Sequence, residues 1–460
     1  MEFNINGKKL SWKQALLLFS LIFGMFFGSG NLIFPVHLGQ IAGAQWGPAT
    51  VGFLLSAVIL PLLALVALAV TRSESVFDLI RPLGHRPATI FLVALQLCLG
   101  PIIVAPRTAT VAYSFFFANW LPKGQQQIGL IVFSMIYFIL VYWSSTQSTK
   151  LLDIIGRYLN PIFLAMLAFI FILAIISPMG STHQAVTTAY QGNAIAPAFI
   201  EGYNTVDAMA GLIFGVTIVH SIQKLGYRKP GEIATVIVKT GTLSMVVLAV
   251  VYVGLILLGT TSLAHMPISS NGAVALTNVM LYYFGRFGQI FIAVMGTLAV
   301  FTTAMGLTAS FARDLNRVWP KVSYKGWLAF ASLLAFIVAT LGLDKMIVWT
   351  APILMFLYPI AIVLILLSLL SPWLGQGRFL YGWALGLTLI AAVFDGLSNA
   401  PFAKDLGGLV SYTVGTTIHV GWYQTHIFGA SVGFGWIGFA FFGIVIGLIC
   451  QKLFGTKTKS

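Results

Sequence analysis

Long apolar runs follow one another along almost the whole chain, and this feature limits the possible folds more than any other. About twelve of the runs approach the roughly 20 residues that a helix needs to cross a bilayer. Only 8% of the residues are charged, whereas a soluble domain carries about 25% because its surface faces water. The sequence therefore predicts an all-α polytopic membrane protein. The expected spans are 13–36, 47–70, 88–118, 127–145, 158–177, 197–221, 233–259, 279–312, 326–342, 347–370, 378–397 and 430–452.

Lysine and arginine are distributed unevenly over the loops, and this predicts the orientation. With the N-terminus in the cytoplasm, 20 of the 25 basic residues fall in cytoplasmic segments, 4 in outer segments and one, Arg107, within the third span. Cytoplasmic loops of membrane proteins carry such an excess. We expect both termini in the cytoplasm and lipid around the spans. The net charge of +14 is a topology signal and does not indicate a nucleic-acid partner.

The first span contains residues that form helices poorly. Gly24, Gly28, Ser29, Gly30 and Asn31 stand within eight residues of one another and weaken a helix there. Non-helical backbone at membrane depth is tolerated where it lines a cavity, and the start of a helix after a break suits a carboxylate. Unwinding from Gly28 to Asn31 is therefore one interpretation. A packing seam of small residues is the other.

The sixth span begins with a similar cluster of polar residues. Glu201, Tyr203, Asn204, Thr205 and Asp207 precede an apolar helix. An acid at the centre of a span costs about 2.5–3.5 kcal/mol, so Asp207, the deeper acid, indicates either a functional site or a helix cap. Glu201 is expected at the outer surface.

The two clusters lie five spans apart, which suggests two inverted halves with broken helices one and six. The repeats would be 1–177 (helices 1–5) and 178–370 (helices 6–10), followed by helices 11–12 in 371–460, all in one membrane domain. The first, third, sixth and eighth spans are the longest or least uniform, and we expect breaks or tilts there.

Two further features are chemically notable. Thr302 and Thr303 follow Ala299 in the eighth span, and on spacing alone the favoured interpretation is hydrogen bonding to the preceding turn. The alternative is an oxygen cage for Na⁺. Arg107 follows a bent segment that is flanked by two prolines, Pro101 and Pro106, and it needs an acid or carbonyl oxygens. Pairing with Asp207 or Glu201 is the default, and binding a substrate carboxylate or reaching an interface are alternatives.

Three stretches resemble one known family. Gly24 to Pro35, Gly100 to Val111 and Gly202 to Gly215 look like the bacterial branched-chain amino acid carriers, which are amino acid:cation symporters. The resemblance covers nearly the whole chain in length, span number and motif order. It implies the five-plus-five inverted repeat of the leucine-transporter fold and a location in the bacterial inner or plasma membrane.

The resemblance also implies site residues. In this fold the amides after the first break hold the substrate carboxylate, the broken helices hold the α-amine, and the first and eighth helices hold Na⁺. The implied substrate residues are Gly24, Met25, Gly28, Ser29, Gly30, Asn31, Tyr203, Asn204, Thr205 and Asp207. The implied Na⁺ residues are Gly24, Phe27, Ala299, Thr302 and Thr303, which raises the weight of the oxygen-cage interpretation.

The chain departs from the family in the third and sixth spans. Several members have a glutamate shortly after the Arg-Thr pair, where this chain has Ala112, Tyr113 and Ser114. Residue 201 is acidic in this chain, and Asn204 occupies a position where the family leads us to expect an apolar residue. The acid gained in the sixth span could compensate for the lost one, or could alter the substrate or the ion.

The expected function is import of leucine, isoleucine and valine with Na⁺ by alternating access. Coupling to H⁺, and transport of other neutral amino acids with either ion, are the alternatives. A channel would need a pore-lining ring motif, and an enzyme would need paired acids or a histidine cluster facing a cavity; the sequence indicates neither. We expect no cofactor and no obligate protein partner, and the oligomeric state stays open.

Overall fold

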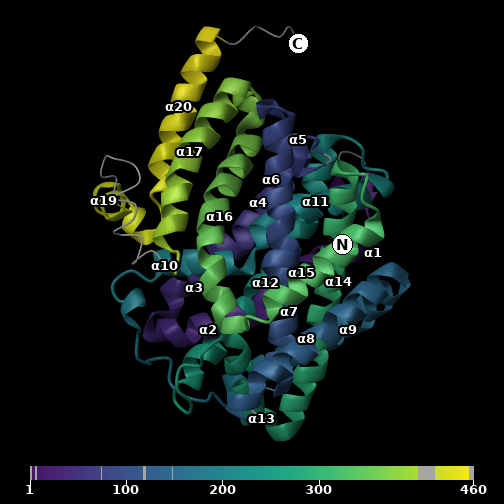
Figure 1. The fold of residues 1–460 in the computed structure, drawn as a ribbon, viewed down its shortest axis with the longest axis vertical. Helices are drawn as coiled ribbons and strands as arrows, with labels where there is room; N and C mark the ends of the chain where they lie inside the picture. Colours follow the sequence, from purple (N-terminus) through teal and green to yellow (C-terminus); the bar gives the residue numbers. More distant parts are fainter. Residues whose placement is uncertain are drawn as a thin grey trace.

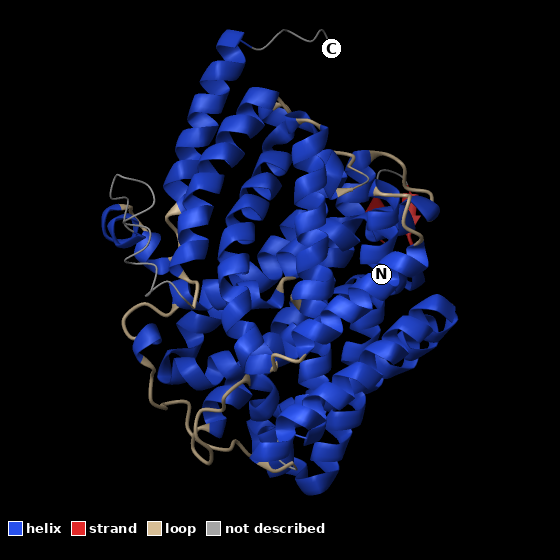
Figure 2. Cartoon of the chain, viewed as in Figure 1, coloured by secondary structure: helices blue, strands red, loops and turns tan. Residues whose placement is uncertain are grey.

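The chain folds into a bundle of helices of very different lengths (Figures 1 and 2). The computed structural model describes residues 3–5, 8–73, 75–117, 121–147, 149–401 and 420–454. Its only strands within these residues are β1 (Phe3–Ile5) and β2 (Lys8–Leu10), an antiparallel ribbon ahead of the first helix. The prediction of an all-α fold is confirmed, because this ribbon contributes only six residues.

The helices follow the expected spans in chain order. They are α1 (Trp12–Phe26), α2 (Ser29–Ala42), α3 (Trp46–Leu54), α4 (Leu60–Val70), α5 (Val76–Ile80), α6 (His85–Leu97), α7 (Val104–Phe117), α8 (Gln126–Gln147), α9 (Thr149–Ile176), α10 (Ile195–Glu201), α11 (Asp207–Lys224), α12 (Pro230–Ser262), α13 (Gly272–Phe291), α14 (Thr297–Val318), α15 (Tyr324–Ala339), α16 (Leu343–Leu374), α17 (Arg378–Ser398), α19 (Val420–His426) and α20 (Trp436–Phe454).

Short 3₁₀ and π segments join or interrupt several of these helices. The 3₁₀ turns are η1 (Gly43–Gln45), η3 (Arg81–Leu83), η5 (Lys123–Gln125), η6 (Thr188–Tyr190), η7 (Gly202–Thr205) and η9 (Ala430–Val432). The π segments are η2 (Leu55–Ile59), η4 (Cys98–Ile102) and η8 (Ile292–Gly296). π segments are often found at functional sites.

Length and hydropathy confirm a multi-pass membrane protein. In the described residues eight helical segments could span a bilayer, or nine if the bent pair Ile195–Thr205 and Asp207–Lys224 counts as one span. The remaining expected spans, the first, fifth and ninth, coincide with the shorter apolar helices Trp12–Phe26, Leu164–Ile176 and Tyr324–Ala339. The count of twelve and the division into repeats at 177 and 370 stay predictions.

All four spans in which we expected irregularity are interrupted. In the first, α1 ends at Phe26 and α2 begins at Ser29. In the third, non-helical dihedrals at Gly100 coincide with Pro101, which cannot donate a backbone hydrogen bond. In the sixth, Val206 has a φ of 65°, a left-handed conformation that is strained for a β-branched residue.

One boundary differs from the sequence-based expectation. The first break lies at Phe27 and Gly28, whereas we expected unwinding as far as Asn31; Ser29 to Asn31 instead form the first turn of α2. The eighth expected span is interrupted, as expected. Gly285, with a φ of 58° and a ψ of −146°, kinks α13 within it, because this backbone conformation is accessible mainly to glycine.

Close helix packing depends on glycine where α2 crosses α12. A Cβ atom at Gly39 would lie 2.0 Å from the Ile256 carbonyl oxygen, and one at Gly259 would lie 1.9 Å from the Val36 carbonyl oxygen. Both distances are far below van der Waals contact, so only glycine permits this crossing. The contact fixes the position of α2, the helix that begins at the first break.

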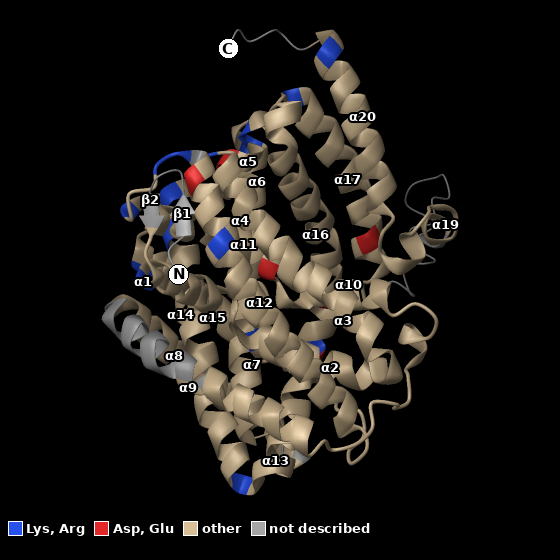
Figure 3. Ribbon diagram, turned by 180° about the vertical axis from the view of Figure 1, so that it is seen from behind, with Lys and Arg blue, Asp and Glu red and all other residues tan. Residues whose placement is uncertain are grey.

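The surface fits a lipid environment with one strongly basic end. Large apolar side chains are exposed along several helices, as at Ile175 (78%), Phe442 (62%) and Leu333 (61%). Lys and Arg gather at the end of the molecule that holds the β ribbon and α5, and the opposite end, around α13, shows little charge (Figure 3). α17 and α20 pack side by side at one edge of the bundle (Figure 1).

Candidate functional site

The first break exposes backbone groups that would be hydrogen-bonded within a continuous helix. In an unbroken helix the Gly28 amide would donate to the Gly24 carbonyl. Here the Gly28 amide donates to the Asn31 side-chain oxygen at 2.9 Å. The first amides of α2 and the last carbonyls of α1 therefore lie at helix ends, where no intrahelical partner exists for them. The break thus offers both donors and acceptors of hydrogen bonds.

Asn31 connects the first break to the second. Its side-chain nitrogen donates to the Asp207 carboxylate at 2.7 Å and also contacts the Tyr252 hydroxyl. The Tyr252 hydroxyl donates to the same carboxylate oxygen at 3.0 Å. All three side chains are at most 2% exposed. Asp207 is therefore the centre of a buried network that joins α2, α11 and α12.

The interpretation of Asp207 as a helix cap is wrong. The residue in the cap position of α11 is Val206, whose side chain makes no capping hydrogen bond. Asp207 is the first helical residue, where a negative charge is favoured by the helix dipole. Its amide lies 3.4 Å from the Thr205 hydroxyl, which itself donates to the Gly202 carbonyl at 2.9 Å.

Arg107 comes from the first turn of α7 and approaches both breaks. It is 2% exposed, and its Nη1 donates to the Asn204 carbonyl at 2.6 Å. The guanidinium also lies over the Phe34 ring at 5.1 Å. The expected direct ion pair with Asp207 or Glu201 is not formed within 4.0 Å; Asp207 attracts Arg107 only through space. Arg107 does not reach an interface.

The remaining residues of the second break are placed by aromatic and amide contacts. Tyr203 is buried and stacks on Tyr358 of α16, with 3.9 Å between ring centroids and 10° between planes. Glu201 is half-buried and interacts with the Asn204 side chain, so the expectation of an exposed Glu201 is wrong. Its compensating role for the acid missing from the third span stays a prediction.

Thr302 and Thr303 lie next to each other in α14, and Thr303 approaches the first break. The Thr302 hydroxyl donates to the Ala299 carbonyl at 2.8 Å, and the Thr303 hydroxyl does so at 3.3 Å. A Cβ atom at Gly28 would lie 3.6 Å from the Thr303 hydroxyl, which shows how closely the two elements approach. Back-bonding uses the hydroxyl protons and leaves the oxygen lone pairs free for a hard cation, which prefers oxygen ligands. Gly24 and Met25 are half-buried, and Phe27 is buried.

The sequence did not single out two tyrosines of this region. Tyr252 lies in the middle of α12 and Tyr358 in the middle of α16, and each is surrounded by apolar residues in the chain. A tyrosine in such a run gives no periodicity or spacing signal. Only the fold brings Tyr252 to Asp207 and Tyr358 to Tyr203.

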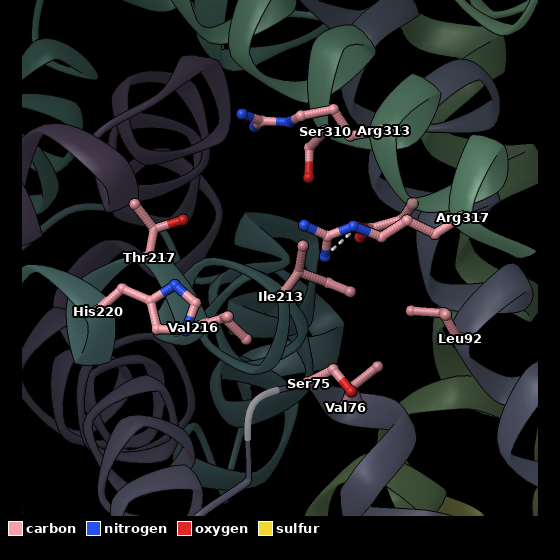
Figure 4. A pocket seen from close by; sticks show the side chains of 11 residues that line it. Ser75, Val76, Leu92, Ile213, Val216, Thr217, His220, Ser310, Arg313 and Arg317 are labelled. Atoms are coloured by element: carbon pink, nitrogen blue, oxygen red, sulfur yellow. Dashed lines mark ion pairs between the residues drawn. The ribbon is translucent and has the colours of Figure 1, made fainter. Parts of the chain in front are cut away.

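A cavity of about 190 Å³ lies beyond the second break, between α5, α6, α11 and α14. Thr217 and His220 of α11 line one side, and Arg313 and Arg317 of α14 line another (Figure 4). Asp314 completes the polar lining; it is 4.0 Å from Arg317 and also contacts the Gln96 side chain. The lining is therefore polar, with more basic than acidic groups.

Sequence comparisons identify the relatives of this chain. Residues 11–454 match the family described as branched-chain amino acid transport protein. The chain is 36% identical to the branched-chain amino acid permease BrnQ of Lactobacillus delbrueckii subsp. lactis, over 86% of this chain and 89% of that protein. It is 34% identical to the branched-chain amino acid permease BraB of Bacillus subtilis, over 92% and 95% of the two chains.

The fold has a counterpart among solved structures. The chain resembles Mhp1, a nucleobase-cation-symport-1 family transporter solved in a closed conformation with bromovinylhydantoin bound. The TM-score is 0.57 at 12% identity, and the match covers 96% of this chain and 93% of Mhp1. At this identity the likeness shows the fold alone. Because the matched family is one of transport proteins and the relatives are permeases, the protein is not an enzyme.

Proposed function

Because the chain belongs to the branched-chain amino acid transport family, we propose that it is a secondary active symporter that imports leucine, isoleucine and valine with Na⁺. The observation that carries this proposal is the meeting of two helix breaks around a buried polar network. Asn31, Asp207 and Tyr252 join the broken helices to α12 at membrane depth, where ionisable groups are costly and generally mark a functional site. The protein would lie in the bacterial plasma membrane with both termini in the cytoplasm.

The substrate would bind between the two breaks. The first-turn amides of α2 at Ser29 and Gly30 suit its carboxylate, because a helix N-terminus attracts anions. The carbonyls near Gly24 and between Tyr203 and Thr205 suit its α-ammonium group. An apolar pocket would discriminate weakly among leucine, isoleucine and valine, since one methylene is worth about 1–3 kcal/mol. This explains why one carrier would accept all three.

Na⁺ would bind on the other side of the first break. The carbonyls of Gly24, Phe27 and Ala299 and the hydroxyls of Thr302 and Thr303 are all neutral oxygens, which suit a monovalent hard cation. The approach of Thr303 to Gly28 supports this placement. An ion shared by α1 and α14 would couple the position of the first broken helix to the rest of the bundle.

Release would follow as one group of helices moves against the other, as in carriers with broken helices. α11 leads from the break at Val206 to Lys224 at the expected cytoplasmic end. The cavity between α5, α6, α11 and α14 lies along this path. Its basic lining would receive a carboxylate leaving towards the cytoplasm. Coupling to H⁺, and transport of other neutral amino acids, remain the alternatives.

Replacing Thr303 by alanine tests the ion site. Loss of one oxygen ligand is expected to raise the Na⁺ concentration for half-maximal isoleucine uptake by roughly 10-fold, because a bond to a charged group contributes about 1.5–3 kcal/mol. Initial uptake rates in proteoliposomes, measured over a Na⁺ series, give this value. Thr303→Ser, which keeps the hydroxyl, should stay near the wild type.

The matched control is Thr308→Ala. Thr308 bonds to the Ala304 carbonyl at 2.8 Å on the same helix but is not among the ion ligands. An unchanged Na⁺ dependence in Thr303→Ala, or an equal shift in Thr308→Ala, would contradict the assignment.

A further inference from the structure

We propose that Arg107 is the charged anchor for the α-carboxylate of the transported amino acid, acting together with Ser29 and the first turn of α2. This inference rests on the proposed function and assigns the contact that fixes the orientation of the substrate. It also explains why a basic side chain lies in the middle of the third span.

Only part of the Arg107 guanidinium group is hydrogen-bonded. Nη1 is bonded to the Asn204 carbonyl, whereas Nε and Nη2 have no hydrogen-bond partner in the described part of the chain. The side chain is 2% exposed, so bulk water does not compensate for this. A buried charge without partners is strongly unfavourable. A ligand that carries hydrogen-bond acceptors would supply the partners that Nε and Nη2 lack.

The vacant edge of the guanidinium has the geometry of a carboxylate site. Nε and Nη2 point the same way from the planar group, and two parallel N–H donors match the two oxygens of one carboxylate. Arginine favours this bidentate contact over any single acceptor. The occupied Nη1 fixes which edge remains for a ligand.

The first turn of α2 lies against this edge. A Cβ atom at Gly30 would be 3.2 Å from Nη2, so glycine allows the helix start to approach the guanidinium. The neighbouring Ser29 hydroxyl is also buried at 1% exposure and has no hydrogen-bond partner in the described residues. Helix N-terminal amides attract anions. The start of α2 and the guanidinium edge therefore lie next to each other, and both can donate hydrogen bonds to an anion.

No protein carboxylate takes this position in the described residues. Asp207 is directed to Asn31 and Tyr252, and Glu201 interacts with Asn204. Asp207 still balances the charge of Arg107 through space. A zwitterion carries no net charge, so its entry would add no net charge to the buried region.

The test compares isoleucine with 2-methylbutylamine, which has the same skeleton without the carboxylate. Dissociation constants are measured by ligand-induced thermal stabilisation of the purified full-length carrier in saturating Na⁺. In the wild type, removal of the carboxylate should weaken binding by at least about 100-fold, as expected for a charged, bidentate contact. In Arg107→Gln this preference should fall below about 10-fold, while the affinity for the amine changes little.

Two further variants keep the test decisive. Arg286→Gln removes an exposed basic residue of α13 and should keep the full preference for isoleucine. Ser29→Ala should reduce the preference by roughly 3–10-fold through loss of one hydrogen bond, and it serves if Arg107→Gln does not fold. An unchanged preference for isoleucine over the amine in Arg107→Gln would overturn the assignment. If Arg107→Gln does not fold, an unchanged preference in Ser29→Ala would overturn it. Absence of isoleucine binding to the wild type would instead overturn the proposed substrate, and the anchor with it.

Discussion

Replacing Asp207 by asparagine is expected to lower isoleucine uptake by about 100-fold. The carboxylate accepts hydrogen bonds from Asn31 and Tyr252, which hold α2 and α12 to the start of α11. An amide keeps the size but loses the charge and presents a donor where acceptors are needed. Two charge-assisted bonds contribute together about 3 kcal/mol, which corresponds to this loss in rate. Initial rates in proteoliposomes, normalised to the amount of inserted protein, measure it.

Asp344 provides a matched control. It also lies in the first turn of a helix, α16, and also contacts an asparagine, Asn271, at 2.6 Å. Asp344 is exposed, so Asp344→Asn should keep nearly full uptake. Wild-type rates in Asp207→Asn, or an equal loss in both variants, would show that the buried network does not support transport.

Replacing Gly259 by alanine is expected to cause the largest loss of stability. The new methyl group would lie 1.9 Å from the Val36 carbonyl oxygen, and the backbone of α2 cannot move aside as a side chain would. Overpacking of this kind costs about 1–3 kcal/mol, which for a chain of 460 residues corresponds to a fall in melting temperature of roughly 1–3 °C. Thermal unfolding of the purified carrier, followed by intrinsic fluorescence, measures the change.

Gly386→Ala is the control for this substitution. Gly386 lies inside α17, and a Cβ atom there would meet nothing within 4 Å. Alanine favours a helix over glycine by about 0.5–1 kcal/mol, so this variant should be as stable as the wild type or slightly more stable. Equal melting temperatures of the two variants would contradict the close crossing of α2 and α12.

Much of the fold could be predicted because membrane helices appear in the sequence as long apolar runs. Apolar length predicted the helices, and local breakers or unusual length predicted that spans one, three, six and eight are irregular. The position of the kink in the eighth span, Gly285, could not be predicted, because a single glycine in an apolar run is common. We expected the first break to extend as far as Asn31, but it ends at Gly28. The Asn31 side chain accepts a hydrogen bond from the Gly28 amide, which allows α2 to begin at Ser29.

The candidate site was predictable only in part. The polar residues of the two breaks stand out against apolar neighbours, so Asn31, Asp207 and Arg107 could be found. Their partners could not, because Tyr252 is an ordinary residue in the middle of α12 and depends on tertiary contacts 45 residues beyond Asp207. Arg107 was expected to pair with an acid, but the fold gives it a backbone carbonyl and leaves one edge vacant.

The most direct test of Na⁺-driven transport is uptake of labelled isoleucine into proteoliposomes at fixed pH, with an inward Na⁺ gradient and without one. We expect concentrative uptake only with the Na⁺ gradient, inhibited by excess leucine and valine. Uptake driven only by a pH gradient would contradict the Na⁺ assignment at Thr302 and Thr303. No isoleucine uptake under either gradient would contradict the proposed substrate.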